Sequence, residues 1–475
     1  MKLPKYIPSN KVVIGSTRSG KSVSEVPDVV AAAERRDIAI VLLDPHTRSL
    51  GWSCLEHLIA RGHQSRIIFD NLSHFDRVPA MRFLRPSTAK HPLKRMAENE
   101  QTARQFTEVL TRRRGGGSLA HAPQTEEWTM HAAMLVIHQE QERPATDLRF
   151  AYQANHPELQ ELIQHCTHDD TRYRFEQVAD GIIKPGQYAA AARLIEGVCG
   201  SPPFIARCGT SFDLYRFLDS AGILIVEGGA NGVSEDALST VLGSIAMQTI
   251  NYVRTRRRPS PRVLLVLDEA VNAGLVGGTE VRALAECQKM GLDIHILVQS
   301  LNFPNSYITD GVLSNCVRHD WFYQANASVC NAAAADLGSP DYRDRIRTLG
   351  IGERFVKCRD KVYRERVHML NDPWGVSGIA KSKARNALKE IYQRPEYWSP
   401  SCSENDSQSG YEKTTPQEPQ ANNPAGSIST SAKRGTRKFS ALRRSTSSSP
   451  GMFSVSSPAL RLATEDSVNS EKDAD

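Results

Sequence analysis

Eight residues near the start of the chain form a glycine-rich pattern of the kind that binds phosphate groups. The pattern is G-x-x-x-x-G-K-S, made by Gly15, Ser16, Thr17, Arg18, Ser19, Gly20, Lys21 and Ser22. It follows a short apolar run and precedes a helix-compatible stretch, which is the strand–loop–helix context that this motif requires. A chance match is the alternative, and it weakens as further elements of a nucleotide site are found.

Each part of this phosphate loop has a chemical role toward a nucleoside triphosphate. Backbone N–H groups of the loop, together with the positive end of the following helix, surround the β-phosphate. The Lys21 ammonium adds charge near the β- and γ-phosphates, and the Ser22 hydroxyl can complete the coordination shell of Mg²⁺. The motif therefore predicts a site for a nucleoside triphosphate, which we expect to be ATP, with Mg²⁺.

A pair of carboxylates far along the chain can complete such a site. Asp268 and Glu269 follow the apolar segment 262–267, which is typical of a buried strand. At the tip of that strand Asp268 can hold Mg²⁺ through a bound water, and Glu269 can orient and deprotonate the water that attacks the γ-phosphate. An acidic pair that merely marks the end of a strand is the alternative.

A third polar position follows the next apolar segment, at 292–298. Gln299 can sense the γ-phosphate or polarise the attacking water. An ordinary hydrogen bond at the end of a strand is the other interpretation of this amide.

The composition restricts the class of protein. The chain has 475 residues, is 40% hydrophobic and carries a net charge of +6, which permits contact with nucleic acid or an anionic membrane surface. Its longest apolar runs are far shorter than the roughly 20 residues that cross a bilayer, and its first residues lack the apolar core of a signal peptide. Nine cysteines without a Cys-x-x-Cys pair suit a reducing cytoplasm.

Short apolar runs that alternate with helical stretches predict an α/β fold with a mostly parallel sheet. The expected strands are 11–15, 38–44, 66–70, 222–227, 263–268 and 293–299. The expected helices are 22–33, 53–61, 235–256 and 280–290.

Two stretches depart from this alternation. Residues 92–206 contain helix-like segments such as 101–113 and 126–140 with little strand signal, which predicts an all-helical insertion. Residues 398–475 are rich in Ser and Pro and poor in aromatic residues, which predicts a disordered tail. The expected domains are therefore 1–91 and 207–397 as the two parts of one core, with the phosphate loop in the first and Asp268 in the second, 92–206 as the insertion, and 398–475 as the tail.

The order of these elements resembles the HerA/FtsK superfamily of ring-forming P-loop ATPases, and most closely the TraG/TraD-like coupling proteins of type IV secretion. The resemblance extends from about residue 8 to residue 375. Besides the phosphate loop (Walker A) and the Leu267-Asp268-Glu269 strand end (Walker B), it rests on these segments: 41–46 (VLLDPH), 126–128 (EEW), 212–214 (FDL), 298–300 (VQS), 312–316 (VLSNC), 334–338 (AADLG) and 349–356 (LGIGERFV).

The resemblance implies a RecA-like motor core with an inserted helical domain. It also implies a homo-oligomer, in this family commonly a hexameric ring, that moves DNA through a central pore and serves secretion or conjugation machinery. The expected location is the cytoplasm, either free or peripheral at the inner face of the membrane. Because the phosphate loop begins at Gly15, we expect no membrane anchor ahead of it.

The sequence departs from the family pattern at two functional positions. The phosphate loop has Arg18 where the family usually has glycine. Coupling proteins often carry an arginine before the glutamine strand that reaches the neighbouring subunit's nucleotide, and Gln288 stands at that place. Lys289 or Arg282 can substitute as this trans-acting residue, although a lysine lacks the planar two-point grip of arginine, or the residue is absent.

Two other functions stay open at this stage. One is a motor of the same type that handles protein during secretion or packaging. The other is a scaffold that binds ATP but hardly turns it over, an idea supported by the missing arginine. A basic, glycine-rich loop at 112–117 either contacts DNA phosphates or is merely solvated.

Overall fold

A nine-stranded, mostly parallel sheet forms the centre of the protein. The structure is a computed structural model that describes residues 5–112, 123–228, 233–303, 306–371, 373 and 378–397, without the side chains of 378–381 and 384. The predicted tail at 398–475, and residues 113–117 of the basic loop, lie outside the described residues. None of the described helices has the length and apolarity needed to cross a bilayer.

The strand order places the early and late parts of the chain side by side. Across the sheet the order is β3-β4-β2-β5-β6-β1-β7-β8-β9, and the neighbours from β3 to β7 are all parallel, whereas β8 and β9 are antiparallel additions. The strands are β1 (Lys11–Ile14), β2 (Ile38–Asp44), β3 (Ile67–Asn71), β4 (Ile223–Glu227), β5 (Arg262–Leu267), β6 (Leu292–Val298), β7 (Arg318–Phe322), β8 (Glu353–Cys358) and β9 (Lys361–Arg366).

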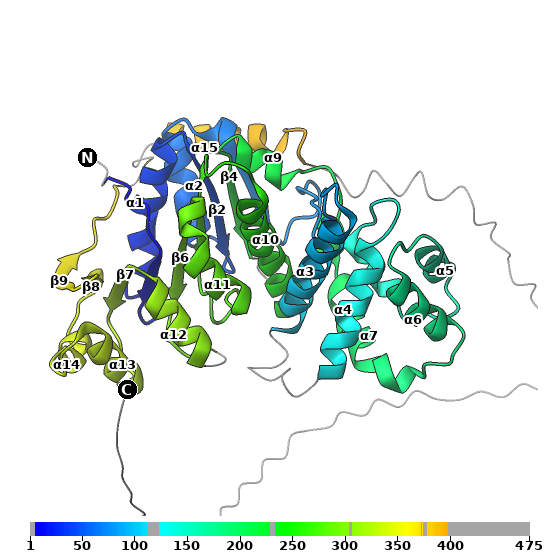
Figure 1. Ribbon diagram of the computed structural model, residues 1–475. Coiled ribbons are helices and arrows are strands. Elements are labelled where there is room, and N and C mark those ends of the chain that lie inside the picture. Colours follow the sequence, from blue (N-terminus) through cyan, green and yellow to red (C-terminus); the bar gives the residue numbers. More distant parts are fainter. Residues whose placement is uncertain are drawn as a thin grey trace, which may run out of the picture. The chain divides into compact units, whose positions relative to one another are not determined.

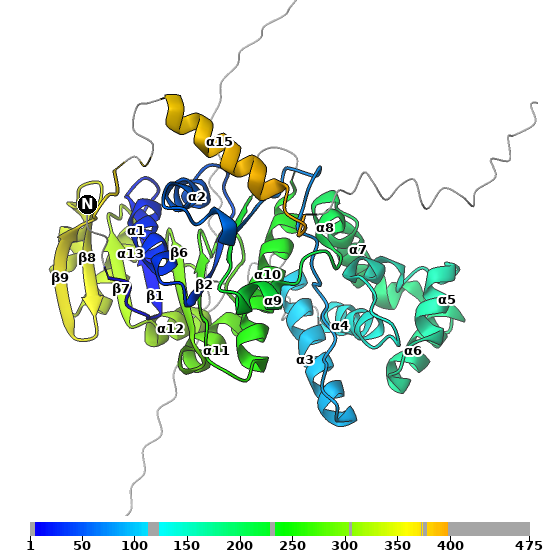
Figure 2. The same ribbon diagram turned by 90° about the horizontal axis from the view of Figure 1, so that it is seen from above.

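Helices cover both faces of this sheet. Figure 2 shows α1 and α2 on one face and α10, α11 and α12 on the other. Their bounds are α1 (Lys21–Glu34), α2 (Leu50–Ala60), α10 (Glu235–Thr255), α11 (Gly278–Glu286) and α12 (Ser306–Asn315). The chain continues through α13 (Ala327–Leu337), α14 (Tyr342–Arg347) and α15 (Gly378–Tyr392). Because both faces are covered, the parallel strands are buried on both sides, which explains their near-continuous apolar sequences.

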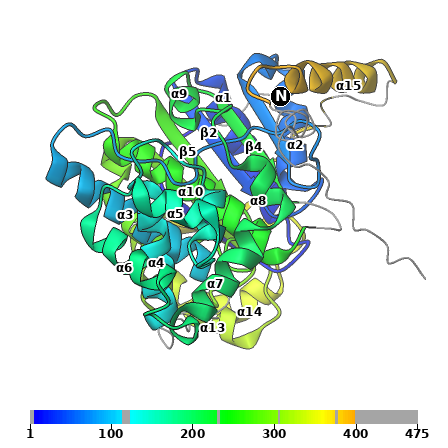
Figure 3. The same cartoon turned by 90° about the vertical axis from the view of Figure 1, so that its right-hand side faces the viewer.

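The segment between β3 and β4 is helical, as predicted. Figure 3 faces these helices: α3 (Pro92–Thr111), α4 (Pro123–Ile137), α5 (Pro157–Gln164), α6 (Asp169–Ala179), α7 (Pro185–Cys199) and α8 (Pro202–Arg207), followed by α9 (Leu214–Asp219). Among the described residues from 92 to 206 no strand occurs, and the backbone pairs only in an isolated bridge between Gln139 and Cys166.

The predicted boundaries of helices were less accurate than those of strands. All six predicted strands are present, with ends within one residue of the prediction. The helix expected at 101–113 begins nine residues earlier, at Pro92, because proline fits the first turn of a helix, where its missing N–H is not needed. The helix expected at 280–290 ends at Glu286 and continues as a separate 3₁₀ turn, Gln288–Met290.

Strand β7 was missed because most of its residues are charged or polar. Asp320 is fully buried, and its carboxylate accepts from Arg318 at 2.8 Å and from Arg354 at 2.6 Å. Burial by itself raises the pKa of Asp320, but these two guanidinium groups outweigh it and hold the pKa below its usual range. Hydropathy does not reveal such a strand, since distant partners neutralise its charges.

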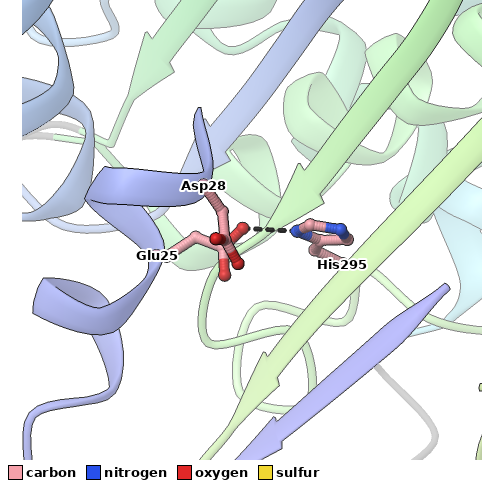
Figure 4. Close-up of side chains that lie close together, drawn as sticks. All are labelled: Glu25, Asp28 and His295. Carbon is pink, nitrogen blue, oxygen red and sulfur yellow. Dashed lines mark hydrogen bonds and ion pairs between the residues drawn. The ribbon is translucent and has the colours of Figure 1, made fainter. Parts of the chain in front are cut away.

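A buried ionic cluster ties α1 to the strands beneath it. Figure 4 shows Glu25 and Asp28 of α1 beside His295 of β6, with the Glu25 carboxylate hydrogen-bonded to the imidazole. The Lys11 ammonium of β1 contacts Glu25 Oε2 at 2.5 Å and Asp28 Oδ2 at 2.6 Å. Glu25, Asp28 and His295 together resemble a cation site, and the ammonium of Lys11 is already paired with both of its carboxylates.

The charges in this cluster depend on one another. Burial alone would raise the pKa of Glu25, but Lys11 and His295 outweigh it and lower the pKa to about 2. Burial alone would lower the pKa of Lys11, but Asp28 and Glu25 outweigh it and raise the pKa. Removing either charge therefore takes away part of what offsets the burial of its partner.

We predict that Lys11→Met lowers the free energy of unfolding by about 3–5 kcal/mol, since it leaves Glu25 charged and buried. Arg35→Met is the matched control, because the Arg35–Asp37 pair is exposed at 43% and 55% and such pairs contribute less than about 1 kcal/mol. Thermal melting of both variants measures the difference. Equal melting temperatures for the two variants would contradict a structural role for the cluster.

Candidate functional site

The phosphate loop connects β1 to α1 at the carboxyl edge of the sheet. Strand β1 lies between β6 and β7, and both neighbours hold the loop. The Gly15 N–H donates to the Val298 carbonyl at 3.1 Å, and the Ser16 N–H donates to the Tyr323 carbonyl at 3.0 Å. The loop therefore starts from a rigid position in the middle of the sheet.

Both glycines of the motif are required by the geometry. A Cβ on Gly15 would lie 2.5 Å from Phe322 Cβ and 2.6 Å from Ser19 Oγ, so no side chain fits there. Gly20 has a φ of 108°, a conformation that L-residues with side chains rarely adopt. Tight packing and a left-handed turn thus bring the backbone of the loop to the start of α1.

Arg18, the departure from the family pattern, also adopts a left-handed conformation, with φ of 64°. Glycine adopts this conformation without strain, whereas for a residue with a Cβ it costs about 1–2 kcal/mol of conformational energy. The side chains of Thr17 and Arg18 are both exposed at the tip of the loop. The backbone shape that glycine favours is therefore kept, and the guanidinium is added on the outside.

Lys21 lies at the centre of the site and is 5% exposed. Its ammonium donates to the Gly15 carbonyl at 2.7 Å and lies 3.6 Å from Glu269 Oε1. Burial lowers the pKa of Lys21, and the nearby Glu269 and Asp268 only partly oppose this effect. A group with more negative charge, such as a phosphate, would stabilise the charged form of this amine.

The acidic strand end meets the phosphate loop. The Ser22 hydroxyl lies 3.4 Å from Asp268 Oδ2, although the two residues are 246 positions apart in the sequence. Asp268 is 1% exposed, and burial, followed by the charges of Asp44 and Glu269, raises its pKa to about 7. The sheet thus brings the two predicted Mg²⁺ ligands together.

The backbone of Glu269 directs its side chain toward the loop. Glu269 has a φ of 46°, which is uncommon for a residue with a side chain. Its N–H donates to Asp268 Oδ1 at 3.0 Å, and its Oε2 accepts from Asn272 at 3.1 Å. The resulting position, 7% exposed and next to Lys21, is one from which a carboxylate can reach a water beside a bound phosphate.

Gln299 lies beside the loop, and a second glutamine that sequence reasoning missed connects the two. The Gln324 amide donates to the backbone carbonyl of Gln299 at 2.9 Å, while its Oε1 accepts from the Ser16 hydroxyl at 3.1 Å. Gln324 follows β7 and is 3% exposed. The signal that would have found it is a polar residue at the end of a strand, but β7 itself was not recognised.

Two further buried acids lie at the same edge of the sheet. Asp44 is paired with Glu227 across β2 and β4, and both are fully buried. The Asp44 carboxylate accepts from the backbone N–H groups of His46 and Gly51, each at 2.9 Å. Burial and the charge of Asp44 raise the pKa of Glu227 to about 7. The edge next to Asp268 therefore has a negative potential that attracts cations.

A turn from the far end of the chain also touches the phosphate loop. The Gly352 N–H donates to the Ser19 carbonyl at 2.9 Å, and a Cβ on Gly20 would lie 3.1 Å from Gly352 Cα. This turn precedes β8, so the outermost hairpin of the sheet reaches the site. No local pattern in the sequence connects Gly352 with Ser19.

The two candidates for the trans-acting cation are exposed. Arg282 lies in α11, and Lys289 lies in the 3₁₀ turn that leads into the amino end of β6. Because β6 is parallel to β1, Lys289 lies at the sheet edge opposite this chain's own phosphate loop. Any contact that Lys289 makes with a nucleotide would therefore involve a neighbouring subunit.

The architecture is similar to that of known proteins. The chain matches no family model and no curated protein sequence. Among solved structures, it is similar to the bacterial conjugative coupling protein TrwB, with a TM-score of 0.55 and 14% identity over 78% of this chain and 90% of that one. For the plasmid coupling protein TrwB in complex with ADP and Mg²⁺, the TM-score is 0.54, with 15% identity over 76% of this chain and 86% of that one. The fold is that of TrwB.

We predict that Gly15→Ala abolishes nucleotide binding, because the added methyl group collides with Phe322 Cβ and Ser19 Oγ and forces the loop out of shape. Gly186→Ala is the control, since a Cβ at Gly186 would meet nothing within 4 Å. Titration with a fluorescent ADP analogue measures binding, and circular dichroism checks that both variants fold. Unchanged affinity in Gly15→Ala would contradict the role assigned to this loop.

Proposed function

We propose that this protein binds ATP with Mg²⁺ and hydrolyses it. The observation that carries the proposal is the meeting of Lys21 and Ser22 with Asp268 and Glu269, which come from two distant parts of the chain. The donor set suits the ligand: an ammonium and a helix amino end for phosphate oxygens, with a hydroxyl and a carboxylate for a hard divalent cation.

The proposed roles follow from the positions of the side chains. Lys21 and the loop of residues 15–22 hold the phosphates, through those backbone N–H groups that do not donate to Val298 or Tyr323, and Ser22 and Asp268 hold Mg²⁺. When bound, Mg²⁺ neutralises charge on the phosphate oxygens. Glu269 orients the attacking water and accepts its proton, and Gln299 contacts the γ-phosphate or that water.

We further propose that hydrolysis drives the transfer of DNA. TrwB, whose fold this chain shares, is described as a conjugative coupling protein and has been solved with ADP and Mg²⁺ and with an ATP analogue. By that likeness we place the protein in a homo-oligomeric ring, with six subunits as the expected number. Its proposed partners are DNA and a secretion or conjugation machine, and its proposed location is the cytoplasm or the inner face of the membrane.

The domain division predicted from the sequence is compatible with this proposal. Residues 1–91 and 207–397 would act as the RecA-like motor core, and 92–206 as an inserted helical domain. Lys289 and Arg282 are the candidates for the residue that reaches the neighbouring nucleotide, because both are exposed cations. The ring would bring either one to the next subunit.

We predict different failures for two substitutions in the site. Lys21→Ala removes the positive charge that faces the phosphates, and it should abolish ATP binding. Glu269→Gln keeps the size of the side chain but removes the base, so ATP should bind while turnover falls by about 10²–10⁴-fold. Phosphate release and nucleotide titration, measured together, separate the two effects. Glu390→Gln, an exposed glutamate on α15, is the control. A Glu269→Gln variant with normal turnover would refute ATP hydrolysis at this site.

We also predict that DNA stimulates the ATPase and that the stimulation decreases as salt rises, since binding to phosphates releases counterions. The measurement is the ATPase rate with and without DNA, from roughly 50 to 300 mM salt. Stimulation by an unfolded protein but not by DNA would favour a motor for protein cargo. ATP binding without turnover under any of these conditions would favour the scaffold.

A further inference from the structure

A groove of about 660 Å³ lies where the helical segment meets the core. It runs between α3 and the carboxyl end of α10, two helices that pack side by side (Figure 1). Their packing is close, because a Cβ on Gly243 of α10 would lie 2.9 Å from Val109 Cγ1 of α3. The volume lies in the range of about 300–1,000 Å³ that is typical of ligand sites.

The lining of this α3–α10 groove is strongly basic. Five cations face one carboxylate, that of Glu98, and the five are Arg85, Lys90, Lys94, Arg254 and Arg257. Three of the cations have acidic partners: Arg85 is 3.0 Å from Asp213, Lys94 is 3.7 Å from Glu98, and Arg254 is 3.3 Å from Glu286.

The other two cations remain available to a ligand. Lys90 leads into α3 and Arg257 follows α10, so they approach the groove from its two sides. Both are exposed, and within the described part of the chain neither forms an ion pair.

A buried amide on the groove adds an independent observation. Gln105 of α3 is 3% exposed and lines the groove. Its Oε1 accepts from Asn251 of α10 at 2.8 Å, but its Nε2 has no acceptor among the described residues. A buried N–H donor without a partner costs about 1–3 kcal/mol, so this amide favours any acceptor oxygen that reaches it.

The groove is separate from the nucleotide site. Strand β5 begins at Arg262, a few residues after the end of α10, and Asp268 follows its other end. The groove therefore lies toward the amino edge of the sheet, whereas the phosphate loop lies at the carboxyl edge. An anion in the groove would not be the triphosphate of ATP.

We infer that the α3–α10 groove binds the phosphodiester backbone of a single-stranded nucleic acid. Unpaired cations with an unpaired N–H donor suit a ligand that offers anionic oxygens and no donors, and a flexible strand can follow a positively charged groove. The inference rests on the proposed DNA-transfer function and gives it a specific binding surface.

The test uses the full-length protein and a fluorescein-labelled oligo-dT of about 20 nucleotides, longer than the roughly 4–16 that one such groove covers, with affinity measured by anisotropy at several salt concentrations. The double variant Lys90→Gln/Arg257→Gln should weaken binding about tenfold, and the slope of log affinity against log salt should become shallower by about 0.7 for each phosphate that is no longer neutralised. Gln105→Leu removes the buried donor without changing the charge. It should weaken binding and leave the salt slope unchanged.

The control is Arg343→Gln/Arg347→Gln, which removes the same charge from exposed positions of α14, beside the distant β8 end of the sheet. If the unchanged protein binds neither oligo-dT nor a DNA duplex, the proposed DNA transfer and the groove inference both fail. If the protein binds but the groove variants behave like the α14 control, only the groove inference fails. Preferred binding of a DNA duplex, or equally tight binding of polyglutamate, would also overturn it.

Discussion

The site depends on one property of parallel sheets, namely that the carboxyl ends of the strands share an edge. Strands β1 and β5 are separated by β6, yet the residues that follow them meet, with Ser22 Oγ 3.4 Å from Asp268 Oδ2. No local interaction could join segments 246 residues apart. The helical segment between β3 and β4 is tolerated because it leaves the sheet order unchanged.

Ionic interactions next to the phosphate loop fix the helix that carries Lys21. Glu25 lies about one turn after Lys21 in α1 and is held by Lys11 of β1 and His295 of β6. Strand β1 leads directly into the phosphate loop, and β6 lies beside it. The position of Lys21 thus depends on buried ionic groups as well as on apolar packing.

The sequence allowed the parts of the fold built on apolar runs to be predicted, because strands buried on both faces must be apolar. Strand β7 was not predicted, since its buried Asp320 is neutralised by Arg354, a partner that only the folded chain reveals. The contacts of Gln324 and Gly352 with the phosphate loop were not predicted either, because Gln324 follows β7 and Gly352 precedes β8, and neither strand was recognised. Glu227 was visible as an acid at a strand end, but its pairing with Asp44 depends on a strand order that no local pattern encodes.

The hydrogen bond from Gly352 to the Ser19 carbonyl has a mechanical consequence. Gly352 is bonded on its other side to Val367, which follows β9, so the turn is fastened to the outermost hairpin. Any rearrangement that withdraws the Ser19 carbonyl must break this link or pull the hairpin with it. The β8–β9 hairpin at the end of the sheet is therefore mechanically coupled to the phosphate loop. A conformational change in the loop would be transmitted to this hairpin.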